Sequence, residues 1–390
     1  MTRIFASSRT SKVRAACTLL VGIAAVVTGV VVSAQGQGRG GGRGQGQGQA
    51  QGQGGGQGQG RWIRLAPIPE PNEERQFAVA NGKLYAFGGN TVEVGGKPGA
   101  PPGVVLEYDP AGDKWTKKKN MQLPAHHVAV AESGGKIYVF GGAVQRQPGG
   151  PNYIPVNNSW EYDPAADTWK ALAPMPTKRI AAAAVAVGGK IYVMGGAGNY
   201  PSRDDQPLNG NEPHRVLDLN QVYDPATNTW ATRQTMPTPR SHVFAGAVGT
   251  KIYLIGGRLG SMAISTGTPT DIVEEYDTAT DKWGYLKSRM PTPRDSGVAA
   301  VFQGKIYVLG GQQITALNNS VSRAFEVYDP AANEWASMAS MPLARHGIVG
   351  GVIGNRLYIG GGHITAAFSG GEPLNSPNLD ALELTANNTR

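Results

Sequence analysis

The sequence has a single cysteine and little charge. The cysteine is Cys17, so a fold that begins after residue 60 has no thiol for a disulfide, a thiolate metal site or a cysteine nucleophile. Charged residues make up 16% of the chain and aromatic residues 7%, whereas glycine (56) and proline (27) are abundant. This composition favours many short strands joined by turns over helical bundles.

Acidic residues are absent from the first 60 positions, and this absence explains the basic charge of the chain. The basic residues of that segment are Arg3, Arg9, Lys12, Arg14, Arg39 and Arg43. Removing these six from the formal charge of +8 leaves +2 for residues 61–390. The charge therefore predicts no nucleic-acid partner for the folded part.

The N-terminus has the pattern of a secretory leader. Basic residues precede an apolar run at residues 15–32, and the small residues Val32 and Ala34 fit a cleavage site. We expect a signal peptide at residues 1–34, cleaved near Ala34, and a secreted or periplasmic protein. The run is long for a signal, so an uncleaved membrane anchor is the alternative. Residues 35–60, almost purely Gly and Gln, predict a disordered linker.

An apolar strand that ends in two glycines recurs six times after Arg61. The first copy, at residues 83–89, reads KLYAFGG. The other copies are at residues 136–142, 190–196, 251–257, 305–311 and 356–362. Their tyrosines are spaced by 51 to 61 residues, and a period of this length indicates a repeat architecture.

Two further elements accompany this strand. A Tyr-Asp pair, usually followed by Pro, precedes a Trp by six or seven residues, at Tyr108, Tyr162, Tyr223, Tyr276 and Tyr328. A Met-Pro-x-x-Arg segment ends at Arg179, Arg240, Arg294 and Arg345. Because Asp-Pro is turn chemistry, each repeat predicts four strands: a small apolar strand, the Tyr–Gly-Gly strand, the Tyr-Asp strand and the Trp strand.

These elements, six times in register over essentially all of residues 61–390, resemble the kelch repeat. The resemblance implies an all-β, six-bladed β-propeller. Relatives of this kind include galactose-oxidase-like propellers, whose copper chemistry needs a tyrosine–cysteine crosslink. Cys17 lies outside the fold, so that chemistry is excluded, and we predict no cofactor and no metal.

The sixth blade is expected to close with the N-terminal strand. Residues 381–385 align with residues 105–109, which places Leu384 in the position of the tyrosine and Thr385 in that of the aspartate. No Trp strand follows them, whereas Trp62 precedes the first repeat. We therefore expect the strand around Trp62 to be the fourth strand of the sixth blade, which removes open sheet edges.

Long connections between second and third strands predict the functional face, because binding concentrates on loops of a rigid scaffold. Two rings of side chains are expected to face its centre. One is the Arg position, with His127 in that slot of the second repeat and Arg75 displaced by an insertion in the first. The other follows each glycine pair. The polar members predicted to bind ligand are Arg75, His127, Arg179, Arg240, Arg294, Arg345, Asn90, Arg258, Gln312 and His363.

Two interpretations of the arginines stay open. In kelch relatives these two positions often bind acidic peptides or small anions, and converging guanidinium groups suit carboxylates. Alternatively, the arginines join neighbouring loops through carbonyls and acidic partners, since buried arginine is normally paired. For catalysis the weak candidates are Asp295 and His127, with His126, His242 and His346 nearby; no local spacing indicates a metal site.

The leading hypothesis is an exported recognition module without enzymatic activity. Its partner would be an acidic small molecule, a glycan or a protein segment, with membrane contact only through an uncleaved leader. One alternative is a sugar mutarotase or epimerase, because the resemblance extends to N-acetylneuraminate epimerase, the periplasmic kelch mutarotase of sialic acid. The other is a structural surface module tethered by the Gly/Gln stretch.

Overall fold

A computed structural model describes residues 60–90, 101–146, 153–203, 206–208, 215–260, 268–315, 318–366 and 374–385. For Glu73 and Asn90 it describes the backbone alone. The predicted leader at residues 1–34 lies outside this part, as does the linker at residues 35–60 up to its last residue. Both therefore stay predictions.

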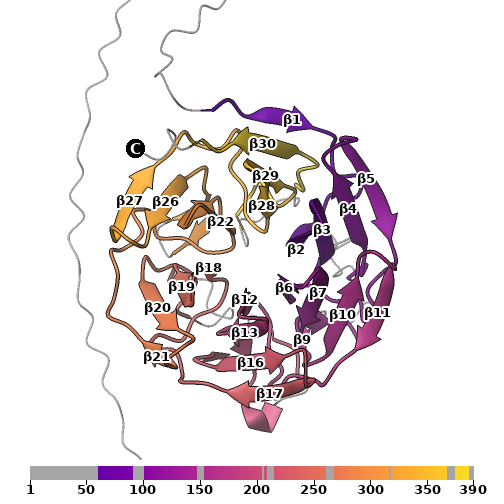
Figure 1. The fold of residues 1–390 in the computed structure, drawn as a ribbon, viewed down its shortest axis with the longest axis vertical. Coiled ribbons are helices and arrows are strands. Elements are labelled where there is room, and N and C mark those ends of the chain that lie inside the picture. Colours follow the sequence, from indigo (N-terminus) through magenta and orange to yellow (C-terminus); the bar gives the residue numbers. More distant parts are fainter. Residues whose placement is uncertain are drawn as a thin grey trace, which may run out of the picture. The chain divides into compact units, whose positions relative to one another are not determined.

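Six four-stranded antiparallel sheets stand around a central axis (Figure 1). The first strands, nearest the axis, are β2 (Glu73–Ala80), β6 (Ala129–Ser133), β12 (Ala183–Val187), β18 (Phe244–Val248), β22 (Val298–Phe302) and β28 (Val349–Ile353). The second strands are β3 (Lys83–Asn90), β7 (Lys136–Phe140), β13 (Lys190–Met194), β19 (Lys251–Ile255), β23 (Lys305–Leu309) and β29 (Arg356–Gly360). The predicted six-bladed, all-β propeller is confirmed.

The outer half of each blade completes the sheets. The third strands are β4 (Val105–Asp109), β10 (Ser159–Asp163), β16 (Asn220–Asp224), β20 (Val273–Asp277), β26 (Phe325–Asp329) and β30 (Leu379–Glu383). The fourth strands are β5 (Lys114–Lys118), β11 (Thr168–Ala171), β17 (Thr229–Thr232), β21 (Lys282–Trp283), β27 (Glu334–Ser337) and β1 (Ile63–Leu65).

Three of the connections between second and third strands contain small ribbons. These are β8 (Ala143–Val144) with β9 (Ile154–Pro155), β14 (Ala197–Gly198) with β15 (Arg215–Val216), and β24 (Gln312–Ile314) with β25 (Asn319–Val321). A 3-10 turn, Pro201–Arg203, lies in the third blade. Within the described part, no helix is both long enough and apolar enough to span a bilayer.

The N-terminal strand closes the ring as predicted. β1 pairs with β30, and Trp62 packs in one core cluster with Leu382 and Phe325. The predicted register at this closure was wrong by two residues. Leu357 pairs with Leu382 as Leu84 pairs with Tyr108, so Leu382, not Leu384, takes the tyrosine position. Glu383, not Thr385, takes the aspartate position.

The turn between third and fourth strands joins neighbouring blades. Asp167 has a left-handed backbone (φ 51°), which Asp and Asn tolerate better than most side chains. Its carboxylate accepts a hydrogen bond from Tyr162 Oη at 2.6 Å and another from the backbone N–H of Lys119 in the preceding blade at 3.0 Å. The same pair of contacts recurs at Asp113, Asn228, Asp281 and Asn333. The turn residue therefore stabilises both its own blade and the contact between blades.

Aromatic side chains fill the wedges between blades. Phe140 of the second blade lies 5.7 Å from the ring of Tyr223 and 5.2 Å from that of Trp230, both in the third blade. Trp230 also donates its indole N–H to the carbonyl of Ala173 at 2.9 Å. Each blade thus packs large apolar area on its neighbour, as the repeated Tyr and Trp predict.

The glycine pair permits close approach of the next blade. At Gly141, which has φ of 58°, a Cβ would lie 2.6 Å from the carbonyl oxygen of Arg179, which leads into the third blade. The N–H of Gly142 donates to the same carbonyl at 2.9 Å. A side chain would both clash and strain the backbone at this position.

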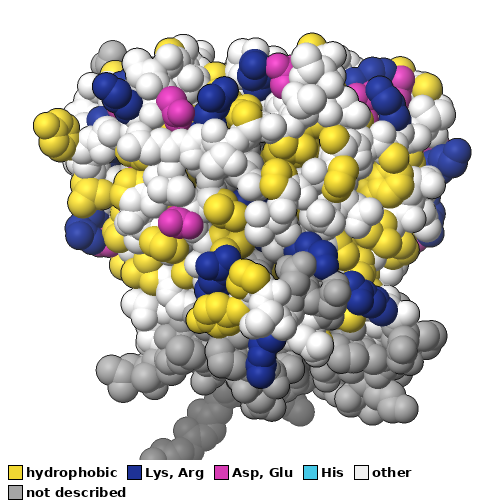
Figure 2. All heavy atoms as spheres, turned by 90° about the horizontal axis from the view of Figure 1, so that it is seen from below, with side chains coloured by type: hydrophobic (Ala, Val, Ile, Leu, Met, Phe, Trp, Pro, Cys, Tyr) yellow, Lys and Arg dark blue, Asp and Glu magenta, His cyan; other side chains and the backbone are white. Residues whose placement is uncertain are grey.

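The outer surface carries mixed charge. In the upper part of Figure 2, Lys and Arg side chains lie among Asp, Glu and apolar side chains. This distribution agrees with the charge of +2 left for residues 61–390.

Candidate functional site

The four arginines after Met-Pro are buried inside the blades. Each has 0 to 1% of its surface exposed. Arg240 Nη2 donates to Glu274 Oε2 at 2.7 Å, Arg294 binds Glu326, and Arg345 Nη2 donates to Asp380 Oδ2 at 2.6 Å. Arg179 Nη2 donates instead to the amide oxygen of Gln221 at 2.9 Å, and burial lowers the pKa of Arg179 to about 9.

The partner always comes from the same position of the third strand. Gln221, Glu274, Glu326 and Asp380 pair across the sheet with equivalent residues of the second strands. The arginine carbonyls meanwhile accept from the second glycine of the preceding blade, as in Gly196 to Arg240 at 2.9 Å. Such contacts are what the interpretation of arginines as links between loops predicts, and a ligand-binding role for the four stays a prediction.

The slot is the position that the arginines occupy four residues after the Met of Met-Pro in blades three to six. In the first two blades the equivalent position holds neither Arg75 nor His127. The carbonyl of Asn72 accepts from Gly362 N–H, and the carbonyl of Ala125 faces Gly88, as the arginine carbonyls face the other glycine pairs. Those two predicted positions were wrong. The first repeat has no insertion, because Ile68 precedes Lys83 by the same spacing as Met236 precedes Lys251.

Arg75 lies on β2, three residues beyond the slot. Its side chain is buried, with its aliphatic part near Gly89, and none of its guanidinium nitrogens has a hydrogen-bond partner within the described chain. Burial lowers the pKa of Arg75 to about 10, and the negative charge of Glu70 opposes this shift.

Two residues beyond the slot, a ring of backbone surrounds the axis. Its members share a left-handed backbone with φ of 51 to 59°, namely Glu74, His127, Ala181, His242, Ser296 and Gly347. Hydrogen bonds join successive blades: Ala181 N–H donates to His127 O, His242 N–H to Ala181 O, Ser296 N–H to His242 O and Gly347 N–H to Ser296 O. Side chains at these positions are therefore held at the axis by the closure of the propeller.

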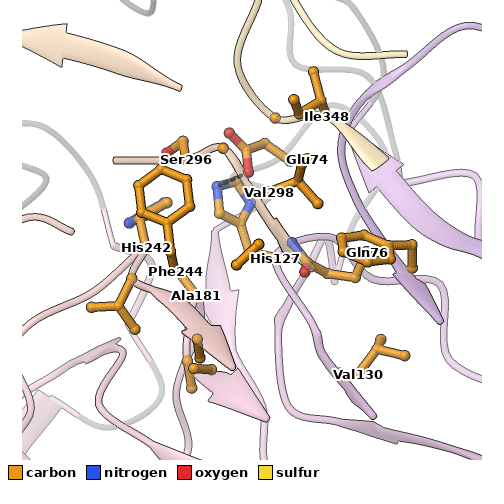
Figure 3. Close-up of a pocket in the computed structure, with 18 of the residues that line it drawn as sticks. Glu74, Gln76, His127, Val130, Ala181, His242, Phe244, Ser296, Val298 and Ile348 are labelled. Carbon is orange, nitrogen blue, oxygen red and sulfur yellow. Dashed lines mark ion pairs between the residues drawn. The ribbon is translucent and has the colours of Figure 1, made fainter. Parts of the chain in front are cut away.

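An axial cavity of about 190 Å³ ends at this ring. Its polar residues are Glu74, Gln76, His127, His242 and Ser296, and apolar residues, mostly of the first strands, form its walls, from alanines to Phe77 and Phe244 (Figure 3). Figure 3 shows Glu74, His127, His242 and Ser296 close together, with Val130 farther away from them.

The pattern of exposure indicates how solvent reaches the cavity. Alternate residues of the first strands, such as Val130, Ala184 and Ala299, line the cavity and are partly exposed. Val301, the next alternate residue on β22, is 37% exposed. Access therefore runs along the first strands from the side of the short first-to-second turns, opposite to the predicted loop face.

Glu74, His127 and His242 converge at the inner end of the cavity. One ligand atom from each lies within 4.8 Å of the others. His127 Nε2 is 3.4 Å from Glu74 Oε2, and the rings of His127 and His242 are 5.4 Å apart. Burial lowers the pKa of His127 well below its usual value, and the neighbouring His126 and His242 act in the same direction.

A second polar layer lies on the loop side of the ring. Arg258 Nη2 donates to Asp295 Oδ1 at 2.8 Å, and Ser296 Oγ and Gln312 Nε2 donate to the same oxygen at 2.8 and 3.3 Å. Burial alone would raise the pKa of Asp295, but the charges of Arg258 and His242 and the hydrogen bonds from Arg258 and Ser296 together outweigh burial, and the pKa is lowered. Asp295 is therefore a charged, fully buried partner of Arg258, and a catalytic role for it stays a prediction.

The residues that follow the glycine pairs do lie beside those that follow the slot. Isolated bridges join Ser241 with Arg258, Asp295 with Gln312 and His346 with His363. His363 lies near His346, whose ring centroid is 5.6 Å away. The backbone of Asn90 pairs with Glu73, and its side chain lies outside the described part.

Sequence reasoning missed Glu74, Gln76 and Ser296 as residues of a site. A usable signal was present, since Glu74, His127 and His242 all stand two positions after the slot. To use this signal, the slot must be placed at Asn72 in the first blade and at Ala125 in the second, where no arginine marks it.

Known proteins share the repeats of this chain. Residues 209–362 match the KLHDC2/KLHL20/DRC7 Kelch-repeats domain, and residues 124–176 and 178–237 match the Kelch motif. Kelch-like protein terF of Aspergillus terreus is 28% identical over 310 residues, which cover 78% of this chain and 64% of that protein. The chain belongs to the kelch-repeat β-propellers.

Other kelch proteins match less of their own length. Kelch-like protein 36 of Rattus norvegicus is 28% identical, covering 62% of this chain and 44% of that protein; for alpha-scruin of Limulus polyphemus the values are 29%, 66% and 27%. The chain thus spans between about a quarter and two thirds of these relatives. The structure of YjhT matches with a TM-score of 0.66 at 19% identity, covering 83% of this chain and 98% of that one, which shows a shared fold.

Proposed function

We propose that this kelch propeller is an exported recognition module that binds a small polar ligand in its axial cavity. One observation carries the proposal: a cavity on the axis combines apolar walls with Glu74, His127, His242 and Ser296 at its inner end. Ligand sites generally have this composition, a mostly apolar lining with a few fixed polar groups.

The size of the cavity limits the ligand. Drug-sized ligands occupy pockets of roughly 300–1,000 Å³, whereas this cavity has about 190 Å³. A monosaccharide, or the end of a glycan or side chain, is therefore the expected occupant. Hydroxyl groups would donate to the Glu74 carboxylate and accept from Ser296 or Gln76.

An acidic ligand held by the arginines has less support. Arg240, Arg294 and Arg345 already have carboxylate partners. Arg75 and Arg179 have no such ion pair among the described residues, but both are buried.

Saturation-transfer NMR with a panel of neutral and acidic monosaccharides tests the cavity. Ala184 lines its wall and is partly exposed, so Ala184→Leu should fill the cavity and abolish binding without unfolding the protein. Ala279→Leu, in an exposed turn of the fourth blade, is the matched control and should bind like the wild type. Unchanged binding by Ala184→Leu would place the ligand elsewhere.

Export rests on the sequence of residues 1–34. Expression in a bacterial host should yield an extracytoplasmic protein whose N-terminal residue is Gln35. A protein that keeps residues 1–34 and stays in the membrane fraction would support the anchor instead.

A mutarotase or epimerase is the second candidate, and the Glu74–His127 contact favours it. A carboxylate 3.4 Å from an imidazole can exchange a proton with a sugar that enters the cavity. Exchange NMR should then show accelerated interconversion of anomers by the wild type and a loss of this acceleration in Glu74→Gln. If sugars of the panel bind but none of them interconverts faster, the mutarotase is refuted and the recognition module is supported.

A further inference from the structure

We propose that Glu74, His127 and His242 bind one divalent transition-metal ion, with Zn²⁺ as the reference ion, at the inner end of the axial cavity. The inference rests on the proposed function only where it concerns the organic ligand. Its first support is the set of side chains: two imidazoles and one carboxylate are a common ligand set for zinc.

The distances fit a metal site. In a tetrahedral site with bonds of about 2.0–2.1 Å, two ligand atoms are about 3.3 Å apart. His127 Nε2 and Glu74 Oε2 are already 3.4 Å apart, and all three ligand atoms lie within 4.8 Å of one another. Small side-chain rotations bring the third atom to the same separation.

The backbone fixes this arrangement before any ion binds. Glu74, His127 and His242 occupy the same left-handed position in three different blades, and hydrogen bonds around the ring hold His127 and His242 through Ala181. A site on rigid, interlocked backbone loses little freedom when it takes up an ion.

Neighbouring side chains orient the two imidazoles. His127 Nδ1 shares a hydrogen bond with His126 Nδ1, and His242 Nδ1 is 3.0 Å from Ser241 Oγ. With a proton on Nδ1 of His127, donated to His126 Nδ1, and a proton on Nδ1 of His242, Nε2 of each of these two ligands keeps its lone pair and can bind a metal. Metal-bound histidines generally have such a second hydrogen bond.

The local charge also suits a cation. Arg258, the nearby cation, is paired with Asp295. Glu74 supplies the negatively charged ligand of the three, and its charge also acts on Arg258.

Three protein ligands leave a coordination position open toward the cavity. Sites of this type bind water or a substrate group, whereas structural zinc sites have four protein ligands. The expected occupant is an anionic or hydroxyl oxygen, such as the carboxylate of an acidic sugar. The metal would thus supply the positive charge that the paired arginines do not.

The test uses the full exported protein, stripped with a chelator and titrated with Zn²⁺ alone by calorimetry, with metal content checked by mass spectrometry. We expect one Zn²⁺ per chain and a higher midpoint of thermal unfolding on its addition. Glu74→Gln, His127→Gln and His242→Gln, tested singly, should each weaken binding by at least about tenfold. Ca²⁺, which requires more oxygen ligands, should not displace Zn²⁺.

His346→Gln is the matched control, because it removes a buried histidine of the neighbouring layer that is not one of the three ligands. It should bind Zn²⁺ like the wild type. The proposal is overturned if the wild type binds no stoichiometric Zn²⁺, or if every folded ligand variant binds it unchanged.

The outcome is separable from that of the proposed function. Zn²⁺ binding without any sugar binding would leave the metal site standing and refute the ligand. Sugar binding by chelator-treated protein that takes up no Zn²⁺ would support the ligand site and refute the metal site.

Discussion

Blades three to six and blades one and two use the same slot in different ways. In the former, the slot before the first strand holds an arginine, bound to Gln221, Glu274, Glu326 or Asp380 on the third strand. In the latter it holds Asn72 and Ala125, and the equivalent third-strand residues are Leu106 and Trp160. Ala125 and Trp160 belong to one apolar cluster.

The difference shows that the two positions change together. In this slot, a buried guanidinium occurs only where the third strand provides a polar partner, and where the guanidinium is missing the equivalent third-strand residue is apolar. Replacing a buried ion pair by well-packed apolar residues is often neutral for stability, so a propeller can contain both kinds of blade. The backbone role of the slot, its carbonyl facing the preceding glycine pair, is common to both.

Breaking one ion pair should have the largest effect. Arg294→Ala leaves Glu326 buried without its charged partner, and we expect a loss of about 3–5 kcal/mol in the free energy of unfolding. Urea unfolding followed by tryptophan fluorescence measures it.

The double variant Arg294→Met with Glu326→Leu imitates the apolar slot of blade two and should recover at least half of that loss. A double variant as unstable as Arg294→Ala would mean that blade five needs the charge itself, and that the two kinds of blade are not interchangeable.

Lowering the pH tests whether the buried histidine His346 near the axis, rather than the arginine ion pairs of the slots, limits the free energy of unfolding. Burial lowers the pKa of His346 to about 3, with His363 and Arg258 acting in the same direction and Asp295 opposing them. Between pH 6.5 and 3 the unfolded chain therefore binds a proton that the folded chain does not, so stability falls as the pH falls.

From pH 7 to pH 4 this group should cost about 3 kcal/mol of unfolding free energy. His346→Gln removes that contribution, so its stability should fall by about that much less over the same range. Equal pH dependence in the two proteins would show that His346 is not kept neutral in the fold.

Most of the fold could be predicted from the sequence, because the signals are local. The glycine pairs, the Tyr-Asp turns and the tryptophans each specify backbone within a few residues, and six copies supplied the register. The closing blade was harder to align: Leu382 takes a tyrosine position, and no aromatic residue marked it. The Leu-Glu pair at residues 382–383 matches the Leu-Glu pair at residues 106–107, and the alignment that this match suggests is two positions off.

The candidate site could be predicted only in part, for a physical reason. Glu74, His127 and His242 meet because the ring closes and because each has a left-handed backbone, and neither condition appears as a local spacing. Arginine occupies the slot in four blades, whereas a backbone carbonyl that faces a glycine pair is common to all six. The repeated arginine therefore does not indicate Asn72 and Ala125 as the equivalent residues. The burial of the arginines likewise depends on third-strand partners far along the sequence.

The smallest expected effect comes from a second arginine on the same carboxylate. Asp380 binds the buried Arg345 through Oδ2 and, across the closing seam, Arg64 through Oδ1 at 2.7 Å, but the Arg64 side chain is 52% exposed. Water already solvates that guanidinium, so Arg64→Ala should lower the unfolding free energy by less than about 1 kcal/mol. Arg345→Ala, which removes the buried partner, should cost several times more. If the two variants lost equal stability in urea, the seam rather than burial would determine the strength of these pairs.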